Sequence, residues 1–368
     1  MINGLFSVRA ARIGLALQCL VGCSFLAGCS KKADVWVAGG KFLVHGTESY
    51  KQGQTLTLTA QTPALDTQVL LFNYQDPELD DILDALANGK VPVLAHQLWV
   101  PPTTGDLQMY NVLSGSGTYT ATNISTGGKI ALALAQDDKY VYAAHPFAAA
   151  VSVIDKSKLS VTATLQMSAG QQPSLIGKDV GLYVISNGTL FKLSGGSNPV
   201  VLGSAPMDDG VDDIAVGQGF VVVPSIGNDK IYVFVDDASQ GNPHLWWTIN
   251  TQNGSPARVA ISRNSPTAYV TLMTGTEGTA PGIVDVIPLA ARDATQIAHV
   301  TVGPCPGSIA VAQVEDLGSW EDRTVLVGNQ CDSTLSRIHI DTISTDSNSP
   351  ATVDTIPLPG VPNAIATH

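Results

Sequence analysis

The chain has 368 residues, of which 44% are hydrophobic and 14% are charged, together with 35 glycines and 21 prolines. This composition indicates a globular, turn-rich protein and excludes an intrinsically disordered one. The formal net charge is −12. Because phosphate binding rests on lysine and arginine, this charge argues against nucleic acid and anionic headgroups as partners.

Residues 1–28 have the pattern of an export signal. Arg9 and Arg12 precede an apolar run from 13 to 26, which is shorter than the ~20 residues of a membrane-spanning helix. The run ends in the tetrapeptide Leu-Ala-Gly-Cys at 26–29, which resembles the lipobox of bacterial lipoproteins. The resemblance implies cleavage before Cys29 and a lipid on its thiol. The alternative is an ordinary signal peptide with an incidental cysteine.

The expected mature chain is an envelope lipoprotein held to the membrane by Cys29, with residues 29–33 as its tether. Ser30 rather than Asp follows the cysteine, and the sorting pattern of enterobacterial lipoproteins then implies the outer membrane. Cleavage removes two arginines and no acid, which leaves 17 basic and 31 acidic residues and a net charge of −14. The sequence does not indicate whether the protein faces the periplasm or the cell surface.

Residues 129–166 contain four short apolar or β-branched runs, each closed by a polar turn. The runs lie at 130–134, 140–144, 151–155 and 161–165. They are too short for helices and rich in residues that suit a pleated surface, so they predict four antiparallel strands. One such sheet cannot bury both of its faces alone, so similar sheets are expected beside it.

The second of these strands has a pattern that recurs along the chain. A large apolar or aromatic residue is followed by Val and then by small or turn residues. Seven copies lie at 35–39, 98–102, 140–145, 182–187, 220–224, 268–271 and 325–329. Most repeats are about 40 residues long, which is the period expected of propeller blades.

Two stretches resemble the YVTN-type β-propeller repeat. Residues 151–155, Val-Ser-Val-Ile-Asp, match its third strand in full, and residues 269–271, Tyr-Val-Thr, match its second strand, although Leu272 replaces the Asn. The resemblance covers residues 34–368 and implies an all-β propeller, and the seven copies of the second strand predict seven blades. It implies little about activity, because propellers support unrelated functions.

The two ends of the repeat region complement each other. Residues 362–367 look like a first strand without a second, and residues 35–39 look like a second strand without a first. A C-terminal strand that completes the N-terminal blade would close the ring and remove the long free edges.

The longest insertion, residues 76–87, predicts a short amphipathic helix. Asp76 suits the N-cap and Pro77 the first helical position, while four aliphatic residues form one stripe. We expect it on the flat face of the propeller, either as a lid over apolar surface or as a docking element.

Two cysteines remain once the signal is removed and Cys29 is lipidated. Cys305 and Cys331 lie at the two strand ends of one predicted blade, on the same side. In an oxidising compartment they predict a structural disulfide, with a redox-active pair as the alternative.

The sequence contains no nucleophile elbow, phosphate-binding loop or haem-attachment motif. In a propeller, the connections from outer to first strand and from second to third strand share one face around the channel. The polar residues expected there are His145, Gln171, Gln172, Asp208, Asp209, Asp212, Asp213, Ser255, Asn329 and Gln330. His145 is either a base or ligand, or a turn residue before Pro146, and the acidic stretch either holds a cation or is a solvated turn.

These observations favour a non-catalytic binding or scaffolding module, without cofactor or metal, for a protein, peptide or other envelope ligand. The alternative is a propeller enzyme, such as a lactonase or a quinoprotein-like oxidoreductase, with a metal or cofactor in the central funnel.

Overall fold

The computed structural model describes residues 33–39, 42–48, 59–61, 71–74, 95–100, 106–113, 119–127, 129–237, 241–275, 278–316, 319–345 and 350–367. The expected signal segment, Cys29 and the helix predicted at 76–87 lie outside these residues. Within the described ranges, no helix is long and apolar enough to span a membrane.

The described strands form seven four-stranded antiparallel sheets. The first contains β28 (Ala364–Thr367), β1 (Ala33–Gly39), β2 (Phe42–Glu48) and β3 (Thr59–Gln61), and the second contains β4 (Leu71–Tyr74), β5 (Ala95–Val100), β6 (Leu107–Leu113) and β7 (Tyr119–Ile124). The third contains β8 (Ala133–Gln136), β9 (Tyr140–His145), β10 (Ala150–Asp155) and β11 (Ser160–Gln166), and the fourth contains β12 (Pro173–Lys178), β13 (Leu182–Ser186), β14 (Thr189–Leu193) and β15 (Val201–Pro206). The fifth contains β16 (Ala215–Gly217), β17 (Phe220–Ser225), β18 (Lys230–Val235) and β19 (His244–Asn250). The sixth contains β20 (Ser255–Ile261), β21 (Thr267–Met273), β22 (Pro281–Pro288) and β23 (Ala298–Pro304), and the seventh contains β24 (Pro306–Asp316), β25 (Ser319–Asn329), β26 (Thr334–His339) and β27 (Val353–Pro357). Three short 3-10 turns, η1 (Pro146–Ala148), η2 (Ala294–Gln296) and η3 (Ile340–Thr342), lie between strands.

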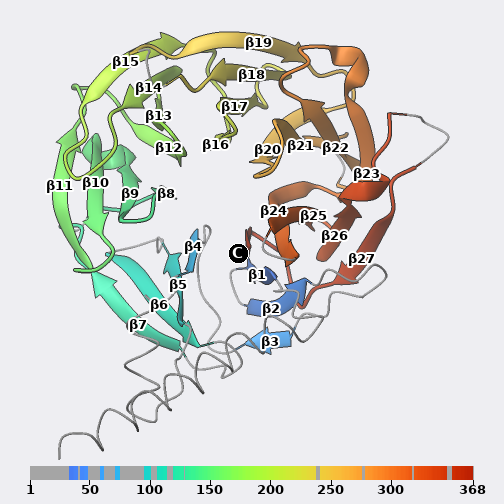
Figure 1. Cartoon of the computed structure of the whole chain (residues 1–368), viewed down its shortest axis with the longest axis horizontal. Coiled ribbons are helices and arrows are strands. Elements are labelled where there is room, and N and C mark those ends of the chain that lie inside the picture. The colour runs from blue at the N-terminus through green and yellow to red at the C-terminus, as the bar shows by residue number, and fades with distance from the viewer. Residues whose placement is uncertain are drawn as a thin grey trace, which may run out of the picture.

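The sheets follow one another in a ring around a central axis, so the chain folds as a β-propeller (Figure 1). The inner strands β8 and β12, β20 and β24, and β24 and β28 pack beside each other around that axis. The outer strands β11, β15, β19 and β23 lie at the rim. The all-β propeller expected from the repeat is therefore confirmed.

The ring is closed by the two ends of the repeat region, as the sequence predicted. Strand β28 pairs antiparallel with β1, which places Ile365 opposite Val37 and Ala366 opposite Trp36. This pairing makes β28 the inner strand of the sheet that contains β1, β2 and β3. The pairing covers the edge of β1 that β2 leaves free.

Strand burial follows from the position of each strand within its sheet. All six residues of β10 are buried, whereas β11 alternates between exposed and half-buried residues. A central strand has a neighbouring sheet on both faces, so both sets of side chains need to be apolar. The continuous Val-rich runs of the second and third strands reflect this packing.

Candidate functional site

In each four-stranded antiparallel sheet, successive connections alternate between the two flat faces of the ring. The connections from outer to inner strand and from second to third strand therefore lie together on one face, here called the channel face. The strand order places there every polar residue that the sequence analysis assigned to a shared face.

His145 is the last residue of β9 and is fully buried. Its Nε2 atom lies 2.9 Å from Oγ of Ser152, also fully buried. The separation suits a base and a nucleophile, but neither side chain is accessible to a substrate. Within the described part of the chain, Nδ1 of His145 has no hydrogen-bond partner that would orient the ring. Burial lowers the pKa of His145 below its usual value. The pair therefore serves the packing of the sheet.

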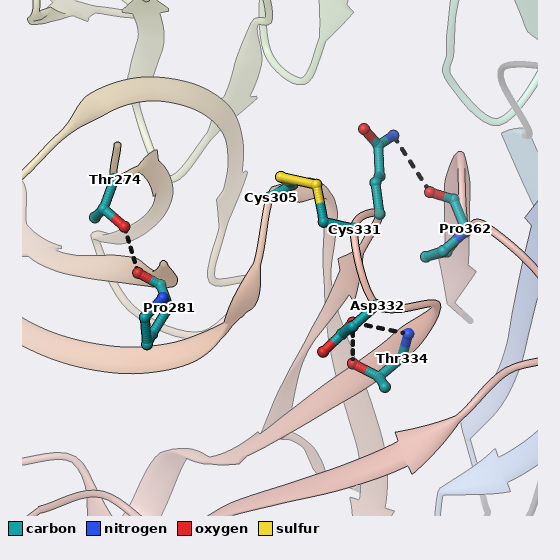
Figure 2. Close-up of a disulfide and its surroundings, with 8 residues drawn as sticks. Thr274, Pro281, Cys305, Cys331, Asp332, Thr334 and Pro362 are labelled. Carbon is teal, nitrogen blue, oxygen red and sulfur yellow. Dashed lines mark hydrogen bonds between the residues drawn. A yellow bond between two sulfur atoms is a disulfide. The ribbon is translucent and has the colours of Figure 1, made fainter. Parts of the chain in front are cut away.

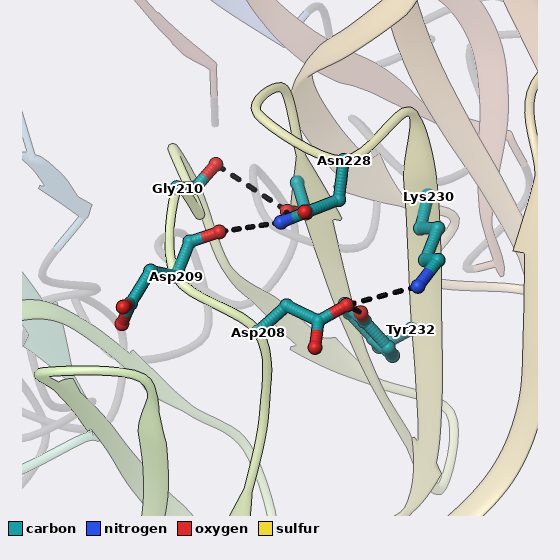
Figure 3. A network of polar contacts seen from close by, with 7 residues as sticks. Asp208, Asp209, Gly210, Asn228, Lys230 and Tyr232 are labelled. Carbon is teal, nitrogen blue, oxygen red and sulfur yellow. Dashed lines mark hydrogen bonds and ion pairs between the residues drawn. The ribbon is translucent and has the colours of Figure 1, made fainter.

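The first acidic residues of the stretch 208–213 make separate contacts (Figure 3). Asp208 Oδ2 accepts a hydrogen bond of 2.9 Å from Lys230 Nζ and another from the Tyr232 hydroxyl. These hydrogen bonds, that of Tyr232 first, lower the pKa of Asp208. The carbonyl oxygen of Asp209 accepts from Asn228 Nδ2 at 2.6 Å, and its carboxylate points away from that of Asp208. Across the described ranges, no three His, Cys, Asp or Glu side chains form a group suited to a metal ion.

Asp213 links two neighbouring blades. Its Oδ1 atom accepts from Ile214 N at 2.9 Å, and its Oδ2 atom accepts from Val259 N, on the inner strand β20, at 3.0 Å. Burial outweighs these two bonds and the nearby charge of Arg258, and raises the pKa of Asp213 to about 6. Its carboxylate holds β20 against the preceding blade.

Arg258, which the sequence analysis did not single out, lies at the centre of this region. It is half-buried in the middle of β20. Its Nη1 donates to the carbonyl of Asp212 at 2.6 Å and its Nε to the carbonyl of Gly307, on β24, at 3.0 Å. The guanidinium therefore spans three consecutive blades. The feature of the sequence that could have indicated this residue is a basic side chain inside a mostly apolar first strand, at 255–261.

Cys305 and Cys331 form a disulfide, as expected, with a Cα–Cα distance of 5.4 Å (Figure 2). The bond joins the start of β24 to the end of β25 on the channel face. Gly278, from the neighbouring blade, lies so close that a Cβ on it would be 3.1 Å from the Cys331 sulfur. The bridge therefore also supports the contact between two blades.

The other expected residues of the channel face are partly used in internal contacts. Asn329 Nδ2 donates to Thr334 Oγ1 at 2.8 Å and to Ser336 Oγ at 2.9 Å. Gln330 Nε2 donates to the Pro362 carbonyl at 3.3 Å. These contacts stabilise the channel face near the ring closure. In other blades, Gln172 N donates to Ser186 Oγ at 2.6 Å and Ser255 Oγ donates to Asp229 Oδ1 at 2.6 Å. The buried Oε1 of Gln171 has no hydrogen-bond partner among the residues that the structure describes.

The channel face also exposes apolar side chains. Phe147, in the turn η1 between β9 and β10, is 81% exposed, and Leu132, just before β8, is 43% exposed. An aromatic side chain in water is a typical anchor of a protein interface. The face thus combines fixed polar groups with accessible apolar ones.

Comparison with known proteins defines the class of fold. No family model matches the chain, and no curated protein matches it in sequence. Solved structures do match. One is a protein from Lactobacillus plantarum with 12% identity and a TM-score of 0.65, covering 92% of this chain and 99% of its own. Another is a provisionally assigned 6-phosphogluconolactonase from Bacteroides fragilis with 10% identity and a TM-score of 0.64, covering 92% and 98%.

A third match is the periplasmic gluconolactonase PpgL of Pseudomonas aeruginosa, with 12% identity, a TM-score of 0.62 and coverage of 92% and 99%. At these identities the similarity shows a shared β-propeller fold and not an activity.

Proposed function

We propose that the chain is an envelope-anchored, non-catalytic propeller that binds a protein or another envelope component through its channel face. The observation that carries this proposal is the exposed Phe147 on that face, beside polar side chains that are held in internal hydrogen bonds. The Ser–His pair of the same blade is inaccessible, which favours binding over acyl transfer.

The anchoring part of the proposal rests on the lipobox-like tetrapeptide at 26–29. In it, residues 1–28 are the signal peptide, Cys29 carries the lipid, 29–33 form the tether and 34–368 the propeller. The periplasmic location of PpgL, a propeller of similar fold, supports an envelope location and, with Ser30, the outer membrane.

The proposal is tested by affinity purification of the full-length protein from detergent-solubilised membranes. Phe147→Ser removes the exposed aromatic anchor and should reduce recovery of the partner at least about tenfold, since interface anchors contribute ~2 kcal/mol or more. Val180→Ser is the matched control, because Val180 is 61% exposed in the β12–β13 turn on the opposite face. If nothing specific is recovered, or if both variants behave alike, the proposal fails.

Analysis of the same purified protein also tests the enzymatic alternative. A stoichiometric metal by elemental analysis, or a chromophore in its absorption spectrum, would favour a lactonase-like or oxidoreductase activity.

A further inference from the structure

Backbone carbonyl groups fix the guanidinium of Arg258 in place, near the carboxylate of Asp213. Two carbonyl oxygens, from Asp212 on one side and Gly307 on the other, accept two of its N–H groups at 2.6 and 3.0 Å. Among the residues that the structure describes, it makes no ion pair. Its other N–H donors have no hydrogen-bond partner among the described residues, and a rigid arginine fork of this kind suits the two oxygens of a carboxylate.

The nearest acids make a simple anion a poor ligand. Asp213 is committed to the backbone N–H groups of Ile214 and Val259. Asp212 uses its backbone to bind Arg258 and Pro224, while its half-buried carboxylate has no hydrogen bond within the described part of the chain. Two acidic side chains, those of Asp212 and Asp213, thus lie near this one arginine. A ligand with only a carboxylate would be repelled by the acids, and one with only an amine by the guanidinium.

We propose that Arg258 and Asp212 form a binding site for a small zwitterion of the amino acid type. The carboxylate of the ligand is held by the free N–H donors of Arg258, and its ammonium group by the carboxylate of Asp212. The site lies at the middle of β20, on the inner wall of the ring, and is distinct from the apolar surface around Phe147. It goes beyond the proposed partner binding and does not depend on it.

The first experiment uses the wild-type full-length protein and saturation-transfer NMR with the twenty standard L-amino acids. At least one should bind. Its carboxamide and the corresponding acid without the amine should each bind at least about tenfold more weakly, because each lacks one charge-assisted contact. The inference is overturned if no amino acid binds, or if the acid without the amine binds equally well.

The second experiment locates the site. Arg258→Gln and Asp212→Asn should each weaken binding of that amino acid at least about tenfold. Arg292→Gln, which removes an arginine stacked on the Trp246 ring in the β22–β23 connection, should leave it unchanged. Asp212→Asn keeps the backbone carbonyl that braces Arg258, so it tests the site even where Arg258→Gln prevents folding. Binding unchanged by Asp212→Asn would overturn the assignment. The assignment of this site does not depend on whether Phe147 is needed for partner binding.

Discussion

Removal of the Cys305–Cys331 disulfide should lower stability by an amount that the structure allows us to estimate. The bridge closes a loop with a sequence separation of 26 residues, which stabilises the fold by about 3.5 kcal/mol in the chain-entropy model. Cys305 has a left-handed backbone with a φ of 53°, which costs a non-glycine residue about 1 kcal/mol. If this residue relaxes when the bond is absent, the net loss is about 2.5 kcal/mol.

Cys331→Ser is the appropriate substitution, because residue 331 is exposed and the change in side-chain volume is small. The entropy of unfolding of a domain of this size is about 0.7 kcal/mol/K, so the melting temperature should fall by about 4 °C. Calorimetry of the full-length protein measures the change. Treatment of the wild-type protein with a reductant should reproduce it and should have no further effect on the variant.

The reasoning is refuted if the variant and the reduced wild-type protein both melt within about 1 °C of the oxidised protein. That result would mean that the contacts around Gly278 and Gln330 already hold the two strand ends together. A loss in the variant alone would instead identify a packing defect caused by serine.

The remaining predictions concern charge and anchoring. Asp236→Asn should cost about 2–3 kcal/mol in urea unfolding, because the buried carboxylate accepts hydrogen bonds from Gly181 N at 2.9 Å and from the Tyr183 hydroxyl at 2.8 Å and lies 3.9 Å from the Lys192 ammonium. Tyr183→Phe, which removes only one of these hydrogen bonds, should cost about 1 kcal/mol. The folded-state pKa of Asp213, about 6, is raised above its ordinary 3.8. The contribution of Asp213 to stability is therefore fully present below pH 4 and is lost as the pH rises through 6, which lowers the free energy of unfolding by up to about 3 kcal/mol. Asp213→Asn should remove this loss from the pH dependence of the unfolding free energy. Parallel curves for the wild type and the variant would contradict the prediction. Cys29→Ser should abolish incorporation of labelled palmitate and move the protein from the membrane to the soluble fraction, and retained labelling would contradict the anchor.

The repeat pattern predicted most of the fold because its physical cause is local. Strands such as β9 and β10 have to be apolar on both faces, since each lies between two other blades, and this requirement is visible as runs of Val, Ile and Tyr. The pairing of β28 with β1 followed from the two incomplete ends, and the disulfide from two cysteines at strand ends on the same side.

The candidate site was less predictable. His145 was expected near the channel on account of its position after a strand, and it does lie at that end of β9, but its ring is turned into the sheet toward Ser152. Arg258 was not expected at all, because its partners are backbone carbonyls of residues 46 and 49 positions away in the chain. Every residue has a backbone carbonyl, so the sequence does not show which carbonyl groups an arginine will contact.

The sequence by itself determined that short sheets repeat, that they close into a ring and which connections share a face, since apolar periodicity and strand order are properties of the chain. Only the tertiary structure decided which polar side chains on that face are accessible and which are consumed by packing. The physical reason is that a side chain meets neighbours from adjacent blades, and these contacts depend on how the blades are stacked.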